Sequence, residues 1–482
     1  KMLTKYIKIS VLLVSISHYA NALDSKEYDY FSNNRQLVRN GVQALLTCNG
    51  LFTSNRSLND VFKYELAYLK SDRFGGIVGS IDKGEWNADK THKTVSVGGI
   101  NSGPEVTAVF REGIGCIVMS PNQSLDEIQN LPELRLPYPN NDPKEILWPN
   151  GDKIPQYSLP SNINKKLLNK ATTWAFNRPT PEQKTLSLIV LHKGNIILEK
   201  YSEGVDLHTK TRTWSTAKSI AVTLIGILVD QELLSLDNPL NFKWKPELSN
   251  PENDPRNKIT LRHVLNMSSG LYPVDSFNME YATGSGLAYW AGASSITGMR
   301  DRGLVRNPGT FWEYENYDTL LAIFAMKKSL KDTKTYLEFP RKSLLDKIGM
   351  RNTFLSTDRF GDFILSSQVY TNARDLARFG LLYLQNGIWN KEQIISEDWI
   401  DFVRTPAPST QHRGNFYGGQ WWLVPDDRID VPKDAYTTAG NRGQYVIVVP
   451  SYDLVIVRRG LDWGKQGFDE WDLTREIIKS FQ

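Results

Sequence analysis

The sequence has few of the residues that build metal sites. Its 482 residues include only two cysteines and six histidines, and no His-Glu-x-x-His motif occurs. A Gly-Lys-Ser/Thr phosphate-binding loop and a Gly-x-Ser-x-Gly nucleophile elbow are also missing from the sequence. We therefore expect chemistry that needs no metal and no cofactor.

A large excess of charge of either sign is also lacking. Lysine and arginine total 57 against 53 acidic residues, and three of the positive charges lie in the first eight residues. Such a balance gives no reason to expect nucleic acid or an anionic membrane as a partner. The length suits two or three domains, and a 40% hydrophobic content is ample for a packed core.

The chain opens with a pattern typical of a secretory signal peptide. Lysines are followed by an apolar run at 9–16 and by a small-x-small cleavage pattern at 20–22. This predicts a signal peptide over 1–22 and a secreted or periplasmic protein without a stable membrane anchor after cleavage. A retained anchor is the alternative, although the apolar run is short for a bilayer span. In an exported chain, Cys48 and Cys116 suggest one disulfide, with two free buried thiols as the alternative.

Ser215 and Lys218 form the most informative chemical pair in the sequence. They stand three residues apart at the start of a predicted helix, so both side chains project from one side. A lysine among apolar neighbours has a lowered pKa and can take the serine proton. The alternative is an ordinary helix start with a solvated lysine, because the same spacing recurs at Ser80 and Lys83. Apolar residues follow at helical spacing: Ala217, Ile220, Ala221, Leu224, Ile225 and Leu228.

Composition divides the rest of the chain into two predicted domains. We expect an N-terminal extension over 23–150 and a second domain over 160–482, with the boundary in a proline-rich stretch. The extension should contain a helix and short strands, at 38–46, 95–97 and 106–110.

Two predicted hairpins, at 186–201 and 445–457, lie near the ends of the second domain. The region between them reads as mostly helical, including a helix at 373–384, and another helix follows at 470–481. This order predicts an α/β (α+β) fold, in which both ends of the domain build one antiparallel sheet around an inserted all-helical lobe. We expect the active site in the groove between sheet and lobe.

Several segments resemble the serine β-lactamase and penicillin-binding-protein superfamily. Besides Trp-Ser-x-x-Lys-Ser at 214–219, the similar segments lie at 259–271, 308–316, 371–380 and 439–444. Within the superfamily the chain is most similar to the class C-like branch that contains 6-aminohexanoate-dimer hydrolases and esterases. The cysteine-bearing extension also resembles the leading segment of exported members. The resemblance implies a β-lactamase/transpeptidase-like fold over about 160–482.

The resemblance also implies roles for individual residues. Ser215 would be acylated, Lys218 would be the base, and Tyr314 would relay protons, since a nearby ammonium favours an ionised phenol. Asn316 would orient the lysine amine or a substrate carbonyl. A tyrosine packed in the core is the alternative for Tyr314, because Tyr-x-Asn also occurs at 138–140 and 370–372.

The oxyanion hole implied by the resemblance pairs the backbone N–H of Ser215 with that of Asn441. Gly440 and Gln444 lie in the same segment and are further substrate-binding candidates. The sequence departs from the penicillin-recognising enzymes at 438–440, which read Thr-Ala-Gly instead of Lys-Thr-Gly. No cation is then available there for a substrate carboxylate.

These features favour an exported serine hydrolase that cleaves a small ester or linear amide through an acyl-enzyme. A second hypothesis is a β-lactamase or cell-wall carboxypeptidase in which Arg442 or Arg413 supplies the missing charge, although we expect both to be solvated surface residues. A third is a binding protein that kept the fold and lost turnover. The oligomeric state is not predicted.

Overall fold

The computed structural model describes residues 28–70, 75–137 and 141–482. The signal-peptide prediction for 1–22 lies outside these residues. Within them, no helix combines the length and the apolar character that crossing a bilayer requires.

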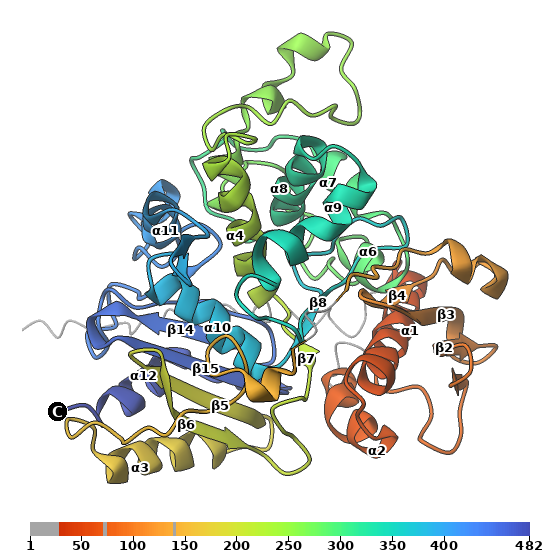
Figure 1. The fold of residues 1–482 in the computed structure, drawn as a ribbon. Helices are drawn as coiled ribbons and strands as arrows, with labels where there is room; N and C mark the ends of the chain where they lie inside the picture. The colour runs from red at the N-terminus through yellow and green to blue at the C-terminus, as the bar shows by residue number, and fades with distance from the viewer. Residues whose placement is uncertain (1–27, 71–74, 138–140) are drawn as a thin grey trace, which may run out of the picture.

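A six-stranded antiparallel sheet forms the base of the second domain (Figure 1). Strands from the two ends of the domain meet at its centre, where β15 pairs with β5. Both predicted hairpins are confirmed, as β5–β6 and β14–β15. The strand order is β12 (Trp422–Leu423), β13 (Tyr436–Thr437), β14 (Tyr445–Val449), β15 (Leu454–Gly460), β5 (Thr185–His192) and β6 (Asn195–Tyr201).

Helices cover both faces of this sheet, which explains why its central strands are apolar at nearly every position. In β5, Leu188 and Val190 pack into one buried cluster, whereas Ile189 and Leu191 pack into another. The predicted helix at 373–384 is confirmed as α10 (Ala373–Leu384), which packs on β14 and β15. The other face is covered by α3 (Lys165–Phe176) and α12 (Glu470–Ile478).

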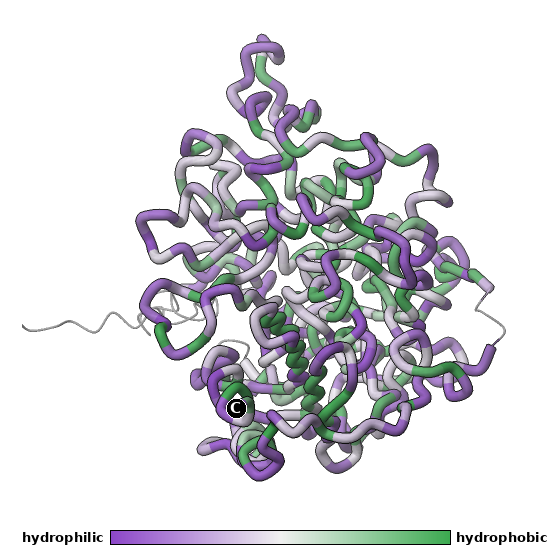
Figure 2. Tube along the Cα trace, turned by 60° about the vertical axis from the view of Figure 1, so that its left-hand side comes forward, coloured by the Kyte–Doolittle hydropathy of each residue, from purple (hydrophilic) through white to green (hydrophobic). Residues whose placement is uncertain are grey.

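The inserted lobe is helical, as expected, and stands over one end of the sheet (Figure 1). At its centre α4 packs against α8 and is buried along almost its whole length. Figure 2 shows hydrophobic residues gathered inside the molecule and hydrophilic ones along its outer loops. The lobe contains α4 (Thr216–Asp230), α5 (Leu261–Leu265), α6 (Gly286–Trp290), α7 (Ser295–Arg300), α8 (Asn316–Ser329), α9 (Thr333–Pro340) and α11 (Glu397–Arg404).

A small sheet of three short strands joins the lobe to the large sheet. Its order is β7 (Thr211–Arg212), β9 (Val369–Thr371) and β8 (Phe354–Leu355). A two-stranded hairpin of β10 (Ile388–Trp389) and β11 (Glu392–Gln393) follows α10. Because β7 ends at Arg212, three residues before Ser215, the small sheet fixes the point from which α4 starts.

The N-terminal extension has its own four-stranded antiparallel sheet, packed against a long helix beside the lobe (Figure 1). The helix and strands predicted at 38–46, 95–97 and 106–110 are confirmed within α1, β2 and β3. Its elements are α1 (Ser32–Cys48), α2 (Leu58–Asp60), β1 (Trp86–Asp89), β2 (Thr94–Gly99), β3 (Gly103–Arg111) and β4 (Gly115–Val118).

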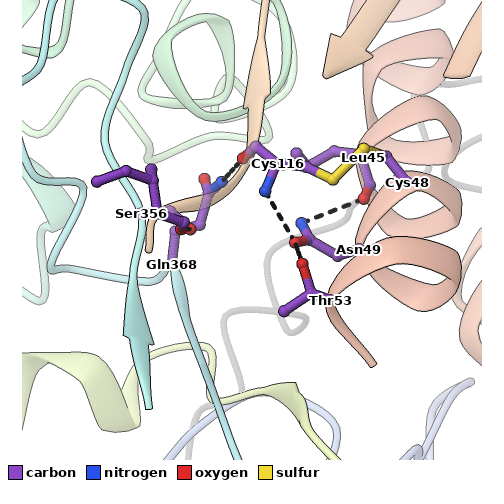
Figure 3. The surroundings of a disulfide bond; sticks show 8 residues. Leu45, Cys48, Asn49, Thr53, Cys116, Ser356 and Gln368 are labelled. Carbon is purple, nitrogen blue, oxygen red and sulfur yellow. Dashed lines mark hydrogen bonds between the residues drawn. A yellow bond between two sulfur atoms is a disulfide. The ribbon is translucent and has the colours of Figure 1, made fainter. Parts of the chain in front are cut away.

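Cys48 and Cys116 form a disulfide that joins the end of α1 to β4. Figure 3 shows the hydrogen bonds around it. Asn49 accepts from the backbone N–H of Cys116 at 3.0 Å, and the Gln368 amide donates to the Cys116 carbonyl at 3.3 Å. The disulfide thus lies where the extension contacts Gln368, the residue directly before β9.

Candidate active site

Ser215 lies at the N-terminus of α4, in the position directly before the first helical residue. Serine commonly caps a helix there by accepting a backbone N–H. The Ser215 hydroxyl makes no such bond and meets Lys218 instead. The side chain is half-buried, so its oxygen is available to a substrate.

Trp214, directly before Ser215, has a left-handed backbone with φ of 50°. This conformation costs free energy for a bulky residue and persists only where its surroundings hold it. Three side chains do so: the Tyr68 ring lies 4.9 Å from the Trp214 ring, the Trp290 ring lies 5.8 Å away, and the Arg212 guanidinium lies 4.7 Å above it. The strained turn from β7 into α4 is therefore fixed by packing.

Lys218 is buried beneath Ser215 and is only 2% exposed. Its amine lies 3.1 Å from the Ser215 hydroxyl, 2.7 Å from the Asn316 side-chain oxygen and 2.7 Å from the Ser366 carbonyl. Burial lowers the pKa of Lys218 to about 7, while the charges of nearby carboxylates oppose that change. Near neutral pH a large fraction of the amine is unprotonated and can accept the serine proton.

Tyr314 precedes α8, and the Lys218 amine lies 4.8 Å from the centre of its ring. Burial raises the pKa of Tyr314, and its hydrogen bond to Ser215 only partly offsets that rise. The expectation of an ionised phenol is wrong, because removal from water disfavours the charged form of Tyr314. Tyr314 is thus a proton donor at neutral pH.

Asn316, the first residue of α8, links Lys218 to groups deeper in the lobe. Its side-chain oxygen accepts from Lys218, and its amide nitrogen donates to Asp275 at 2.9 Å and to Ser285 at 3.2 Å. Asn316 was expected to orient either the Lys218 amine or a substrate carbonyl. These contacts support the first role.

Three buried carboxyl groups, Asp275, Glu280 and Glu315, raise the pKa of Lys218 against the effect of burial. Burial and the charge of Asp275 hold the pKa of Glu315 well above its usual range, and a hydrogen bond between the two side chains adds to the same rise. Sequence reasoning missed this cluster. Glu315 lies between two motif residues, but Asp275 and Glu280 stand in an irregular segment without a recognisable spacing.

Gly440 and Gln444 pair their backbones and close a short loop between β13 and β14, next to the start of α4. We call residues 440–444 the sheet-edge loop. A side chain at Gly440 would place its Cβ 2.1 Å from the Thr213 carbonyl, so this close approach requires glycine. Gln444 is fully buried and bonds to Gly460 and Arg459, so its amide supports the loop. Asn441, by contrast, is exposed at the tip.

Arg442 is not the solvated surface residue expected from the sequence. It is 4% exposed, and its guanidinium donates to the backbone carbonyls of Tyr64, Glu65, Leu461 and Asp462. Its donors are therefore committed to these carbonyls.

Arg413 is exposed, as expected, and donates to the carbonyl of Trp312.

Thr438 occupies the position of the lysine in the Lys-Thr-Gly motif. It is fully buried, and its hydroxyl lies 3.0 Å from that of Thr216 and accepts from the backbone N–H of Val446. A neutral, hydrogen-bonded side chain thus replaces the cation.

Comparison with known proteins identifies the family. The family model described as Beta-lactamase matches residues 178–459, more than half of the chain. The chain belongs to the beta-lactamase family. The matched residues include the hairpin β5–β6, the helix α4 and the sheet-edge loop.

Two curated proteins are similar to this chain along most of their own length. One is an uncharacterized protein from Alkalihalophilus pseudofirmus, 25% identical over 64% of this chain and 94% of that protein. The other is a 6-aminohexanoate-dimer hydrolase from Paenarthrobacter ureafaciens, 24% identical over 58% of this chain and 72% of that protein.

Solved structures confirm the β-lactamase/transpeptidase-like fold. A Bacillus anthracis protein provisionally named a 6-aminohexanoate-dimer hydrolase superposes with a TM-score of 0.54 at 19% identity, over 70% of this chain and 88% of that one. EstCE1, a hydrolase with promiscuous acyltransferase activity, superposes with a TM-score of 0.51 at 14% identity, over 64% of this chain and 98% of that one.

Proposed function

We propose that this protein is a serine hydrolase that cleaves a small ester or linear amide through an acyl-enzyme on Ser215. The observation that carries the proposal is the buried Lys218 amine, 3.1 Å from the Ser215 hydroxyl and with a pKa lowered to about 7. A neutral amine in contact with a half-buried serine hydroxyl is the arrangement that activates a nucleophile.

In the acylation step Lys218 takes the Ser215 proton while the serine oxygen bonds to the substrate carbonyl carbon. The backbone N–H groups of Ser215 and Asn441 stabilise the resulting oxyanion, each contributing about 2.7–4 kcal/mol. Tyr314 donates its proton to the leaving group as the ester or amide bond breaks, and the Lys218 ammonium returns a proton to Tyr314. A water molecule then attacks the acyl-enzyme by the reverse sequence of proton transfers.

The choice of ester or linear amide rests on Thr438. Because this position is neutral and already hydrogen-bonded to Thr216, it offers no charge to a β-lactam or peptide carboxylate. Arg442, the proposed substitute, has its donors committed to backbone carbonyls. The hydrolase relative from Paenarthrobacter ureafaciens, which is named for a linear amide substrate, supports the same substrate class.

We also propose that the protein works outside the cytoplasm, secreted or in the periplasm. The leader pattern at 1–22 and the disulfide between Cys48 and Cys116 both support this location, because disulfides persist in oxidising compartments. In this proposal the extension at 23–150 and the hydrolase domain at 160–482 act as one unit.

Hydrolysis of p-nitrophenyl acetate and a chromogenic cephalosporin by the wild type and Ser215→Ala tests the function. We expect ester turnover that the substitution abolishes, with the cephalosporin left intact. Cephalosporin turnover would move the protein to the penicillin-recognising enzymes, and failure of both substrates to react would favour a binding protein.

A further inference from the structure

A segment of the extension, residues 64–69, bridges the sheet edge and the helical lobe beside Ser215. We call it the bridging segment. Its backbone carbonyls at Tyr64 and Glu65 each accept a 2.7 Å bond from Arg442, the residue that follows Asn441. A buried ion pair between Arg56 and Glu65 holds the segment from the extension side. The sheet-edge loop, which contains the proposed oxyanion donor Asn441, is thus hydrogen-bonded directly to the extension.

Tyr68 is the residue of the bridging segment that reaches the site. Its ring packs 4.9 Å from that of Trp214, whose strained backbone leads into Ser215. Its hydroxyl lies 2.5 Å from the Tyr281 hydroxyl in the lobe and 3.5 Å from the Asn441 amide at the sheet edge. One side chain therefore contacts both walls of the groove and the residue before the nucleophile.

Tyr68 and Tyr314 lie among different neighbours. Tyr314 packs with the rings of Trp312, Tyr417 and Trp422. Tyr68 instead contacts Trp214, Tyr281 and Asn441. In the proposed mechanism Tyr314 protonates the leaving group, which must then lie on the Tyr314 side of Ser215. The acyl part of the substrate consequently extends toward Asn441 and Tyr68.

We propose that Tyr68 is a specificity-determining residue that closes the acyl end of the groove and restricts the enzyme to short acyl groups. The inference rests on the proposed function of Ser215. The Tyr68 ring is held from both walls and is only 8% exposed, so a longer acyl chain cannot displace it without breaking its bonds to Tyr281 and Asn441. In this way a residue outside the matched family region sets the substrate range.

The test compares kcat/KM for p-nitrophenyl acetate, butyrate and octanoate in the wild type, Tyr68→Ala and Tyr68→Leu. We expect the wild type to prefer acetate, and the octanoate-to-acetate ratio to rise at least about tenfold in Tyr68→Ala, with a smaller rise in Tyr68→Leu. Phe62→Ala is the matched control, because Phe62 packs its ring on Trp86 within the extension. Its ratio should equal that of the wild type.

Thermal unfolding identifies any variant that does not fold. If Tyr68→Ala is unfolded, Tyr68→Leu and Tyr68→Trp still decide the question, because the larger indole should lower the octanoate-to-acetate ratio. Unchanged ratios in folded Tyr68 variants, together with an inactive Ser215→Ala, would overturn this inference alone. Full activity in Ser215→Ala would overturn the proposed function itself.

Discussion

Lys218 determines which chemistry the site can perform. The Lys218 amine is buried, and its three hydrogen bonds hold it in one place. Burial lowers its pKa to about 7. Only the unprotonated form can accept the Ser215 proton. The activity of the enzyme should therefore follow the titration of this one group.

We predict that kcat/KM for an ester rises with pH through about 7, the pKa of Lys218. Glu280→Gln should move this rise to lower pH, because the Glu280 charge raises the pKa of Lys218 and its loss favours the neutral amine. A pH–rate profile from pH 5 to 9 measures the effect.

Glu252→Gln serves as the control, because Glu252 is exposed in a peripheral loop. It should leave the profile unchanged. If the rise of kcat/KM in Glu280→Gln stays at the wild-type pH or moves to higher pH, Lys218 is not the titrating base.

At this scale the sequence indicates Ser215, Lys218 and Tyr314 because their motif residues lie close together along the chain or beside a distinctive turn. It does not reveal Asp275 or Glu280, whose effect on Lys218 depends on a fold that brings an irregular segment beneath α4. The protonation of Tyr314 was also mispredicted, since burial cannot be read from a Tyr-x-Asn pattern.

Among the structural elements, the sheet-edge loop at 440–444 and the start of α4 must keep a close fit. Gly440 approaches the Thr213 carbonyl so closely that no larger residue can occupy its place. This contact sets the separation between the backbone N–H groups of Ser215 and Asn441, which form the proposed oxyanion hole.

We predict that Gly440→Ala lowers kcat by roughly 10²–10³, the effect of losing one oxyanion donor. The added methyl group, which has no room beside the Thr213 carbonyl, should also destabilise the fold by about 1–3 kcal/mol. Ester kinetics and urea unfolding measure the two effects separately.

Gly467→Ala is the control, because a Cβ at Gly467 meets no atom within 4 Å. It should leave both quantities near their wild-type values. A Gly440→Ala enzyme with normal kcat would mean that this loop does not contribute to catalysis.

The regular elements were predictable because their patterns are long. The hairpins β5–β6 and β14–β15 contain long apolar runs joined by turn residues, and the helix α10 has a helical period that ends at Asn386 and Gly387. The strands β7, β8 and β9 are only two or three residues long, too short for a periodic signal, and they form only through pairing with one another.

At the scale of the whole molecule, the extension and the beta-lactamase-family domain share one core. Buried apolar residues of α1, β2 and β3 belong to the same cluster as those of α4 and α8. The sequence predicts the elements of the extension but not this docking, because the contacts join Tyr68 to Tyr281 and Asn441, residues far apart in the chain.

We predict that Cys48→Ala/Cys116→Ala destabilises the protein by roughly 4 kcal/mol through the unfolded state. The disulfide spans a sequence separation of 68 residues, and its loss frees that loop when the chain unfolds. Urea unfolding of the double variant and the wild type measures the difference. A reducing agent should lower the stability of the wild type only, and equal stability of both proteins without reductant would contradict the prediction.

The central claim is that Ser215 carries the acyl group during turnover, and intact-mass spectrometry of a reaction quenched in acid tests it most directly. With a slowly hydrolysed p-nitrophenyl ester, the wild type should gain the mass of one acyl group on the peptide that contains Ser215. Ser215→Ala should gain none. An adduct on another residue, or ester turnover by Ser215→Ala at the wild-type rate, would contradict the account.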